Sequence, residues 1–145
     1  MTADLVQFLR ARLHEDELIA RSVQDRSTPW DGQWVPDGTN VLRTKNGHVL
    51  TYGHATTDGR DLPMPLKPGL VDHWARHDPA RVLAEVDAKR QALNHYERIQ
   101  QHTKKSNGGD DYILAEGAVC RQIEFMALPY ADHPDYRTEW APPRP

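Results

Sequence analysis

The longest helix that the sequence predicts begins with His77-Asp78-Pro79-Ala80-Arg81-Val82-Leu83-Ala84-Glu85-Val86-Asp87-Ala88-Lys89-Arg90. Asp78 suits the N-cap position, because its carboxylate can accept hydrogen bonds from the free N–H groups of the first turn. Pro79 suits the first helical position, where no N–H is needed and φ is already fixed. No further glycine or proline comes before Gly108, and apolar residues recur at helical spacing: Val82, Leu83, Val86, Leu93, Tyr96 and Ile99. We therefore expect helices over 71–102, a short one before the Asp78-Pro79 break and a long one after it.

Two more helices are predicted, one on each side of this central pair. Thr2 can cap a helix over 3–26, whose apolar stripe consists of Leu5, Phe8, Leu9, Leu13, Ile19, Ala20 and Val23. A last helix is expected over 112–128, ended by Pro129, with candidate core residues Leu114, Val119, Ile123, Phe125 and Met126. The long N-terminal, central and C-terminal helices together predict a small helical bundle.

The region 30–70 has a different pattern, with short β-prone runs separated by turn residues. Asp37-Gly38 and Asn46-Gly47 mark two turns, and Asn-Gly is a strong hairpin signal because its positions favour positive φ. We expect a small antiparallel β-meander of three strands at about 30–52, packed on the helices, since two strands alone would be marginally stable. Residues 55–70, rich in proline and glycine, are expected to form a connecting loop.

The residues 129–145 are predicted to form a capping tail. One helical turn would place Tyr136 and Trp140 on the same face, and such a face usually docks against a core. Asp132, Tyr136 and Trp140 are therefore the candidate interaction residues. The expected fold class is α+β, mainly α, in a single domain over 1–145.

Composition narrows the classes of protein to consider. The chain has 145 residues, 38% of them hydrophobic, and a net charge of −3. Nucleic-acid binding normally needs clustered positive charge, and no basic block is longer than Lys104-Lys105. The one cysteine, Cys120, excludes an internal disulfide framework and suits a reducing cytosol. No apolar run approaches the roughly 18 residues that cross a bilayer, and the polar N-terminus does not resemble a signal peptide. We expect a cytoplasmic protein with no membrane association.

Three stretches resemble an uncharacterised family of small actinobacterial and actinophage proteins that is known only as a domain of unknown function. They are Asp4-Leu5-Val6-Gln7-Phe8-Leu9-Arg10-Ala11-Arg12-Leu13, His77-Asp78-Pro79-Ala80-Arg81-Val82-Leu83 and Ala127-Leu128-Pro129-Tyr130-Ala131-Asp132-His133-Pro134-Asp135-Tyr136. The resemblance covers both ends and the central helix, and it brings no activity with it. It implies a zinc site built from cysteines between the central and last helices. This chain departs from that pattern, because it has only Cys120 there.

Eight histidines raise a metal hypothesis of their own. His73 and His77 are four residues apart, which on a continuous helix places both imidazoles on one side, as in zinc-binding helices. They form a candidate zinc site with His133 and a carboxylate from Asp78 or Asp132. The competing interpretation is structural, because His77 and His133 adjoin expected helix caps. The sequence contains no His-Glu-x-x-His and no Cys-x-x-Cys motif that would decide for zinc.

The sequence assigns no catalytic and no cofactor-binding residue. It contains no Gly-x-Ser-x-Gly elbow, P-loop or Gly-x-Gly-x-x-Gly motif, and Cys120 lies in a predicted helix where a buried, inert thiol is expected. The leading hypothesis is a non-enzymatic accessory protein, phage- or mobile-element-encoded, that binds a macromolecular partner or a second copy of itself. One alternative is a zinc module or metal-dependent hydrolase using the histidines. Another is a nucleic-acid-binding regulator that uses a basic set at one end of the central helix: Lys89, Arg90, Arg98, Lys104 and Lys105.

Overall fold

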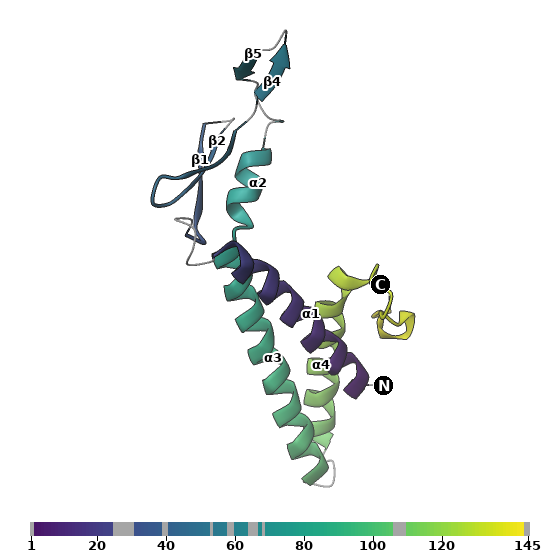
Figure 1. Ribbon diagram of the computed structural model, residues 1–145. Helices are drawn as coiled ribbons and strands as arrows, with labels where there is room; N and C mark the ends of the chain where they lie inside the picture. Colours follow the sequence, from purple (N-terminus) through teal and green to yellow (C-terminus); the bar gives the residue numbers. More distant parts are fainter. Residues whose placement is uncertain are drawn as a thin grey trace. The chain divides into compact units, whose positions relative to one another are not determined.

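The computed structural model describes residues 2–24, 31–38, 41–52, 54–57, 60–63, 67, 69–105 and 110–143 (Figure 1). The chain divides into two compact units, which are described in turn. The helical unit consists of residues 1–15 and 86–145, and the sheet unit consists of residues 16–85. One folding domain can contain two such units, so the single domain over 1–145 stays a prediction. The described elements confirm the α+β, mainly α, fold class.

Three helices build the helical unit. It contains the first part of α1 (Thr2–Val23), most of α3 (Pro79–Lys105) and all of α4 (Asp110–Ala127), which runs back in the opposite direction to α3 (Figure 1). Two short 3-10 helices follow, η1 (Leu128–Tyr130) and η2 (Thr138–Trp140). Its core comes from all three α-helices, in side chains that are at most 2% exposed: Leu5, Leu9, Leu13, Leu93, Tyr96, Ile123 and Ala127. Removal of this surface from water is the main stabilising term for the unit.

Polar contacts at the rim of this core join α1 to α3. The Arg10 guanidinium donates to the Asn94 side chain at 2.9 Å and to the Glu97 carboxylate at 2.8 Å. Both side chains of the ion pair with Glu97 are partly exposed, so its net contribution is small, at most about 1 kcal/mol. It orients the two helices more than it stabilises them.

The sheet unit contains the predicted meander. Strands β1 (Trp34–Asp37), β2 (Val41–Thr44) and β3 (Val49–Tyr52) pair antiparallel in the order β1-β2-β3. Gly38 has φ +68° after β1 and Gly47 has φ +96° between β2 and β3, which confirms the need for glycine at both predicted turns. The β2–β3 loop is longer than a two-residue hairpin. The buried Thr44 orders it by accepting from the His48 N–H at its side-chain oxygen, at 3.0 Å.

The Asp78-Pro79 break connects the end of α2 (Leu70–Arg76) to α3 and also reaches the sheet. One carboxylate oxygen of Asp78 accepts from the Arg81 N–H at 2.7 Å, which confirms the predicted cap. Its other oxygen accepts from the Trp34 N–H at 3.2 Å, at the start of β1. Asp78 therefore fixes the first turn of the helix and the entry of the sheet together.

The expected loop over 55–70 is wrong for its first half, because a second hairpin forms there. Strands β4 (His54–Thr57) and β5 (Arg60–Pro63) pair antiparallel, with His54 opposite Pro63 and Thr57 opposite Arg60. The β-branched Thr56 and Thr57 favour a strand. Proline is tolerated at the end of an edge strand, where no ladder N–H is required.

The predicted helix boundaries are correct to within a few residues. The helix expected over 3–26 is α1, which ends at Val23, and residues 25–30 lie outside the described residues, as does the predicted strand start at Trp30. The helices expected over 71–102 are α2 and α3, and the helix expected over 112–128 is α4. α4 continues through Gly117, where an added Cβ would meet no atom within 4 Å.

Candidate functional site

α4 is apolar on two opposite faces, of which only one is buried. Ile123 and Ala127 on the inner face are fully buried. On the opposite face Leu114 is 73% exposed, Phe125 is 49% exposed and Leu128, just past the end of α4, is 42% exposed. A helix with a single packing face normally carries polar residues on its other side. We call Asp111, Leu114, Ala118, Arg121, Phe125 and Leu128 the outer seam.

The placement of Leu114 and Phe125 corrects the sequence-based expectation that both belong to the core. At about 100° per residue the two side chains lie on the side of α4 opposite Ile123. Helical periodicity shows that a residue belongs to an apolar face, but it does not show which of two apolar faces the rest of the fold covers. The separate 3–4 spacing of the outer seam could have indicated that α4 has a second apolar face.

The outer seam has small residues near its centre. Ala118 is exposed, and the neighbouring Gly117 has free space where a side chain would stand. Arg121 lies beside them and forms an ion pair with Glu124 at 2.5 Å, so the positive charge on the seam has a negative partner on the same helix. The centre of the face can therefore accept a partner surface without leaving the Arg121 charge unpaired.

The candidate interaction residues Tyr136 and Trp140 are used inside the chain. Trp140 is only 4% exposed, and its ring centroid lies 5.1 Å from that of Phe8 on α1. Tyr136 contacts both rings edge-on, at 6.0 Å from Phe8 and 5.7 Å from Trp140. This confirms that the tail docks its aromatic face on the core. Asp132 is the exposed member of the predicted set.

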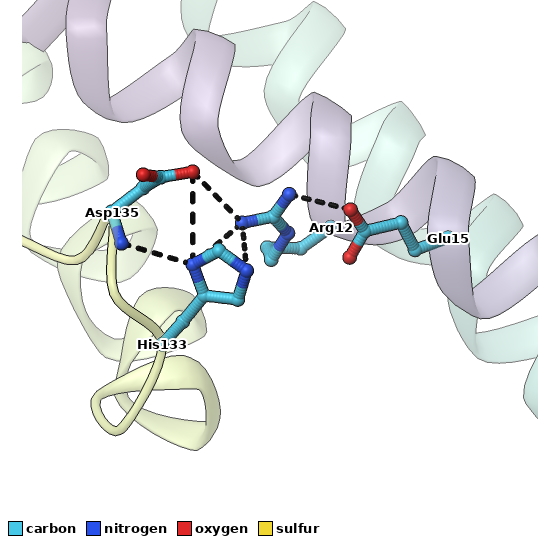
Figure 2. Close-up of polar contacts among 4 residues, drawn as sticks. All are labelled: Arg12, Glu15, His133 and Asp135. Atoms are coloured by element: carbon cyan, nitrogen blue, oxygen red, sulfur yellow. Dashed lines mark hydrogen bonds and ion pairs between the residues drawn. The ribbon is translucent and has the colours of Figure 1, made fainter.

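Arg12 holds the tail to α1 through a cluster of four residues (Figure 2). One guanidinium nitrogen, Nη1, lies 2.7 Å from His133 Nδ1 and 3.7 Å from the Asp135 carboxylate, while Nη2 donates to Glu15 at 2.6 Å. The Arg12 guanidinium also lies over the Phe8 ring, 5.2 Å from its centroid. Arg12 is 93% buried by this packing (7% exposed), and the flanking carboxylates offset the cost of removing its charge from water.

His133, a predicted zinc ligand, belongs to this cluster. The Asp135 N–H donates to its Nδ1 at 3.1 Å, and Arg12 Nη1 lies 2.5 Å from its Nε2 (Figure 2). Nδ1 thus accepts a hydrogen bond from within the protein, which agrees with the structural interpretation of this histidine. No sequence pattern indicates the contact between Arg12 and His133, because the two residues are far apart along the chain.

The other two predicted zinc ligands, His73 and His77, lie in the sheet unit. Both are exposed, and their ring centroids are 4.5 Å apart, as expected for residues one helical turn apart. Asp78 uses both carboxylate oxygens as hydrogen-bond acceptors for the backbone. Among the described residues, no group of three or more His, Cys, Asp or Glu side chains is placed to hold a metal ion. Zinc binding by His73, His77 and His133 stays a prediction.

Cys120 lies on α4 between the two apolar faces and is half-buried. Burial raises the pKa of its thiol, and the nearby Glu124 carboxylate raises that pKa further, while a hydrogen bond with Tyr96 and the Arg121 charge act in the opposite direction. A thiol with a raised pKa is a poor nucleophile at neutral pH, because the thiolate is the reactive form. The geometry agrees with the expected inert cysteine.

The match of a family model to residues 2–142 decides the relationship of this chain to other proteins. The chain belongs to DUF6221, a family of unknown function. The match includes both units and all the elements described above. No curated protein and no solved structure gives a significant match to the chain. In the part of the chain that the structure describes, no helix has the length and apolar character needed to span a membrane.

Proposed function

We propose that this DUF6221 member is a non-enzymatic accessory protein that binds a protein partner through the outer seam of α4. The observation that carries the proposal is the exposure of Leu114, Phe125 and Leu128 on one face of a helix whose opposite face is already buried. Large exposed apolar side chains gathered on one helix face mark interaction sites in proteins. Burying the exposed parts of these three side chains would contribute about 1 kcal/mol each.

The charges around the seam support a protein surface as the partner. Arg121, the basic residue of the seam, forms an ion pair with Glu124. The seam therefore offers no unpaired positive charge that would bind a phosphate group. The seam contains Phe125 and Arg121, and aromatic and arginine residues are enriched in protein–protein interfaces. On the resemblance noted above, we place the protein among phage- or mobile-element-encoded accessory proteins that act in the cytoplasm of actinobacteria.

Photo-crosslinking in expressing cells tests this function. Benzoylphenylalanine is incorporated in place of Phe125, and in a matched control in place of Gln101, an exposed residue of α3 in the same unit. We expect ultraviolet light to give covalent protein adducts, to this chain or to another, from position 125 and not from position 101. Adding Leu114→Glu should suppress the adducts of position 125. Equal adducts at the two positions, or none at position 125, would refute the proposed function.

A further inference from the structure

We propose that the occupant of the outer seam is a second copy of the chain, packed antiparallel so that the two α4 helices are related by a two-fold axis between residues 119 and 120. This inference rests on the proposed function and names its partner. A two-fold interface requires a surface that is complementary to itself, since each residue contacts its counterpart on the partner reciprocally. The outer seam meets that requirement in its spacing and its side-chain sizes.

The spacing of the seam is symmetric about the midpoint between residues 119 and 120. The six residues follow one another at intervals of three and four, as in the contact seam of paired helices. When the helix is reversed about that midpoint, the seam falls onto itself. Leu114 then lies opposite the partner's Phe125, Ala118 opposite the partner's Arg121, and Asp111 opposite the partner's Leu128.

The sizes of the opposed side chains are complementary. Leu114 and Phe125, the most exposed large apolar residues of the seam, meet each other twice across the axis. Ala118, with Gly117 beside it, provides room for the long apolar stem of the partner's Arg121. Each guanidinium can keep its ion pair with Glu124 of its own helix, so the centre of the interface holds two neutral pairs rather than two bare positive charges.

The charges at the two ends of α4 favour the antiparallel direction. The acidic Asp111 is exposed in the first turn. An antiparallel pair keeps the two Asp111 carboxylates apart, at opposite ends of the interface, and it also opposes the two helix dipoles. A parallel pair would bring like ends together.

The size of the seam predicts a weak dimer. The 18 residues of α4 form a helix about 27 Å long. One pair of such helices buries roughly 1,000 Å² in total, near the lower bound for a specific interface. We therefore expect a reversible equilibrium between monomer and dimer in the micromolar range.

Sedimentation velocity of the purified full chain across that range tests self-association. The wild-type chain should shift reversibly from monomer to dimer as its concentration rises. Leu114→Glu, which places a carboxylate against the partner's Phe125, should weaken the dimer about 100-fold. The control Gln101→Glu makes the same chemical change on exposed α3 and should leave the equilibrium unchanged. Circular dichroism of each variant establishes that it is folded.

Cysteine pairing tests the register in a Cys120→Ser background. A mixture of the Leu114→Cys and Phe125→Cys chains should form a disulfide between the two variants on mild oxidation. Neither variant should crosslink with itself, because in the antiparallel register the two copies of position 114 are about 16 Å apart along the axis. Self-crosslinking of either single variant, or a dimer that Leu114→Glu leaves intact, would overturn the proposed pairing.

The outcomes separate this inference from the function on which it rests. A chain that stays monomeric at every concentration, and whose position 125 still crosslinks to a different protein in cells, overturns the second copy but leaves the proposed function standing. A monomeric chain that forms no adduct at position 125 overturns both. Dimerisation with mixture-specific disulfides supports both.

Discussion

The two phenylalanines of the chain lie in contrasting surroundings, although both belong to helices of the helical unit. Phe8 on α1 is 7% exposed and is surrounded by aromatic rings of the tail, with Trp140 and Tyr136 against it. Phe125 on α4 is half exposed, and no described residue gives it an aromatic neighbour. Residues 131–143 of the tail thus provide α1 with an internal partner. The difference indicates that apolar surface on this unit is either covered by the chain itself or available to another molecule.

The largest predicted effect tests this contrast directly. Phe8→Ala should destabilise the folded chain by about 3–5 kcal/mol, because a buried ring and its packing against the tail are lost. Phe125→Ala should cost less than about 1 kcal/mol in the dilute monomer, since its ring is already half in water. Urea unfolding at low protein concentration measures both. Equal losses would show that the outer seam is covered within the monomer.

Arginine substitutions sharpen the contrast between buried and exposed ion pairs. Arg12→Ala should lower the free energy of unfolding by about 1–3 kcal/mol, because it removes charge-assisted hydrogen bonds under the tail. Arg121→Ala should change it by less than about 0.5 kcal/mol, because its pair with Glu124 lies on an open helix face. Thermal unfolding of the two variants below the dimer range supplies the comparison. A larger loss for Arg121→Ala would contradict the assignment of the two faces.

A smaller effect extends the comparison to the sheet unit. Asp78→Ala should cost about 1 kcal/mol, because the first turn of α3 loses its cap and the Trp34 N–H loses its acceptor. Asp72→Ala, which removes an exposed carboxylate of α2, should stay within about 0.5 kcal/mol of wild type. Denaturant midpoints at neutral pH distinguish the two. Matching midpoints would mean that the cap contributes nothing.

The smallest predicted effect concerns Cys120, which lies between the two faces of α4. Its raised pKa means that the folded chain holds the thiol proton more tightly than the unfolded chain does. Stability should therefore be unaffected at neutral pH and decline slightly as pH rises through the thiol range. Alkylation by iodoacetamide should have its midpoint at higher pH in the folded chain than in urea. A lower midpoint in the folded chain would contradict the assigned environment.

Local chemistry made part of this fold predictable from sequence. The Asp78-Pro79 pair predicts an N-cap and the first turn of a helix. In the structure the Asp78 carboxylate accepts a hydrogen bond from the Arg81 N–H. The glycines at the turns of the meander predict a positive φ, and Gly38 and Gly47 both have a positive φ. In each of these cases the determining contact lies within a few residues of the signal.

Contacts between distant parts of the chain were not predictable in the same way. The tail was expected to dock, but nothing in the sequence selects Phe8 as its partner or joins Arg12 to His133. The composition of residues 55–70 is typical of a loop, and it gives no indication that the short strands β4 and β5 pair with each other. α4 has two apolar stripes with the same helical period, and only one of them can pack against the core of the unit. Only the tertiary arrangement decides that Ile123 is buried and that Leu114 is not.

Hydroxyl-radical footprinting tests the central claim, that the outer seam is covered by a partner, most directly. It compares the oxidation of Phe125 and Leu114 in dilute purified chain, in concentrated chain and in extracts of expressing cells, with Phe8 as the internal reference. We predict that Phe8 is protected in all three samples, whereas Phe125 and Leu114 are oxidised when dilute and protected in the other two. Phe125 and Leu114 that are oxidised equally in all three samples would contradict the account.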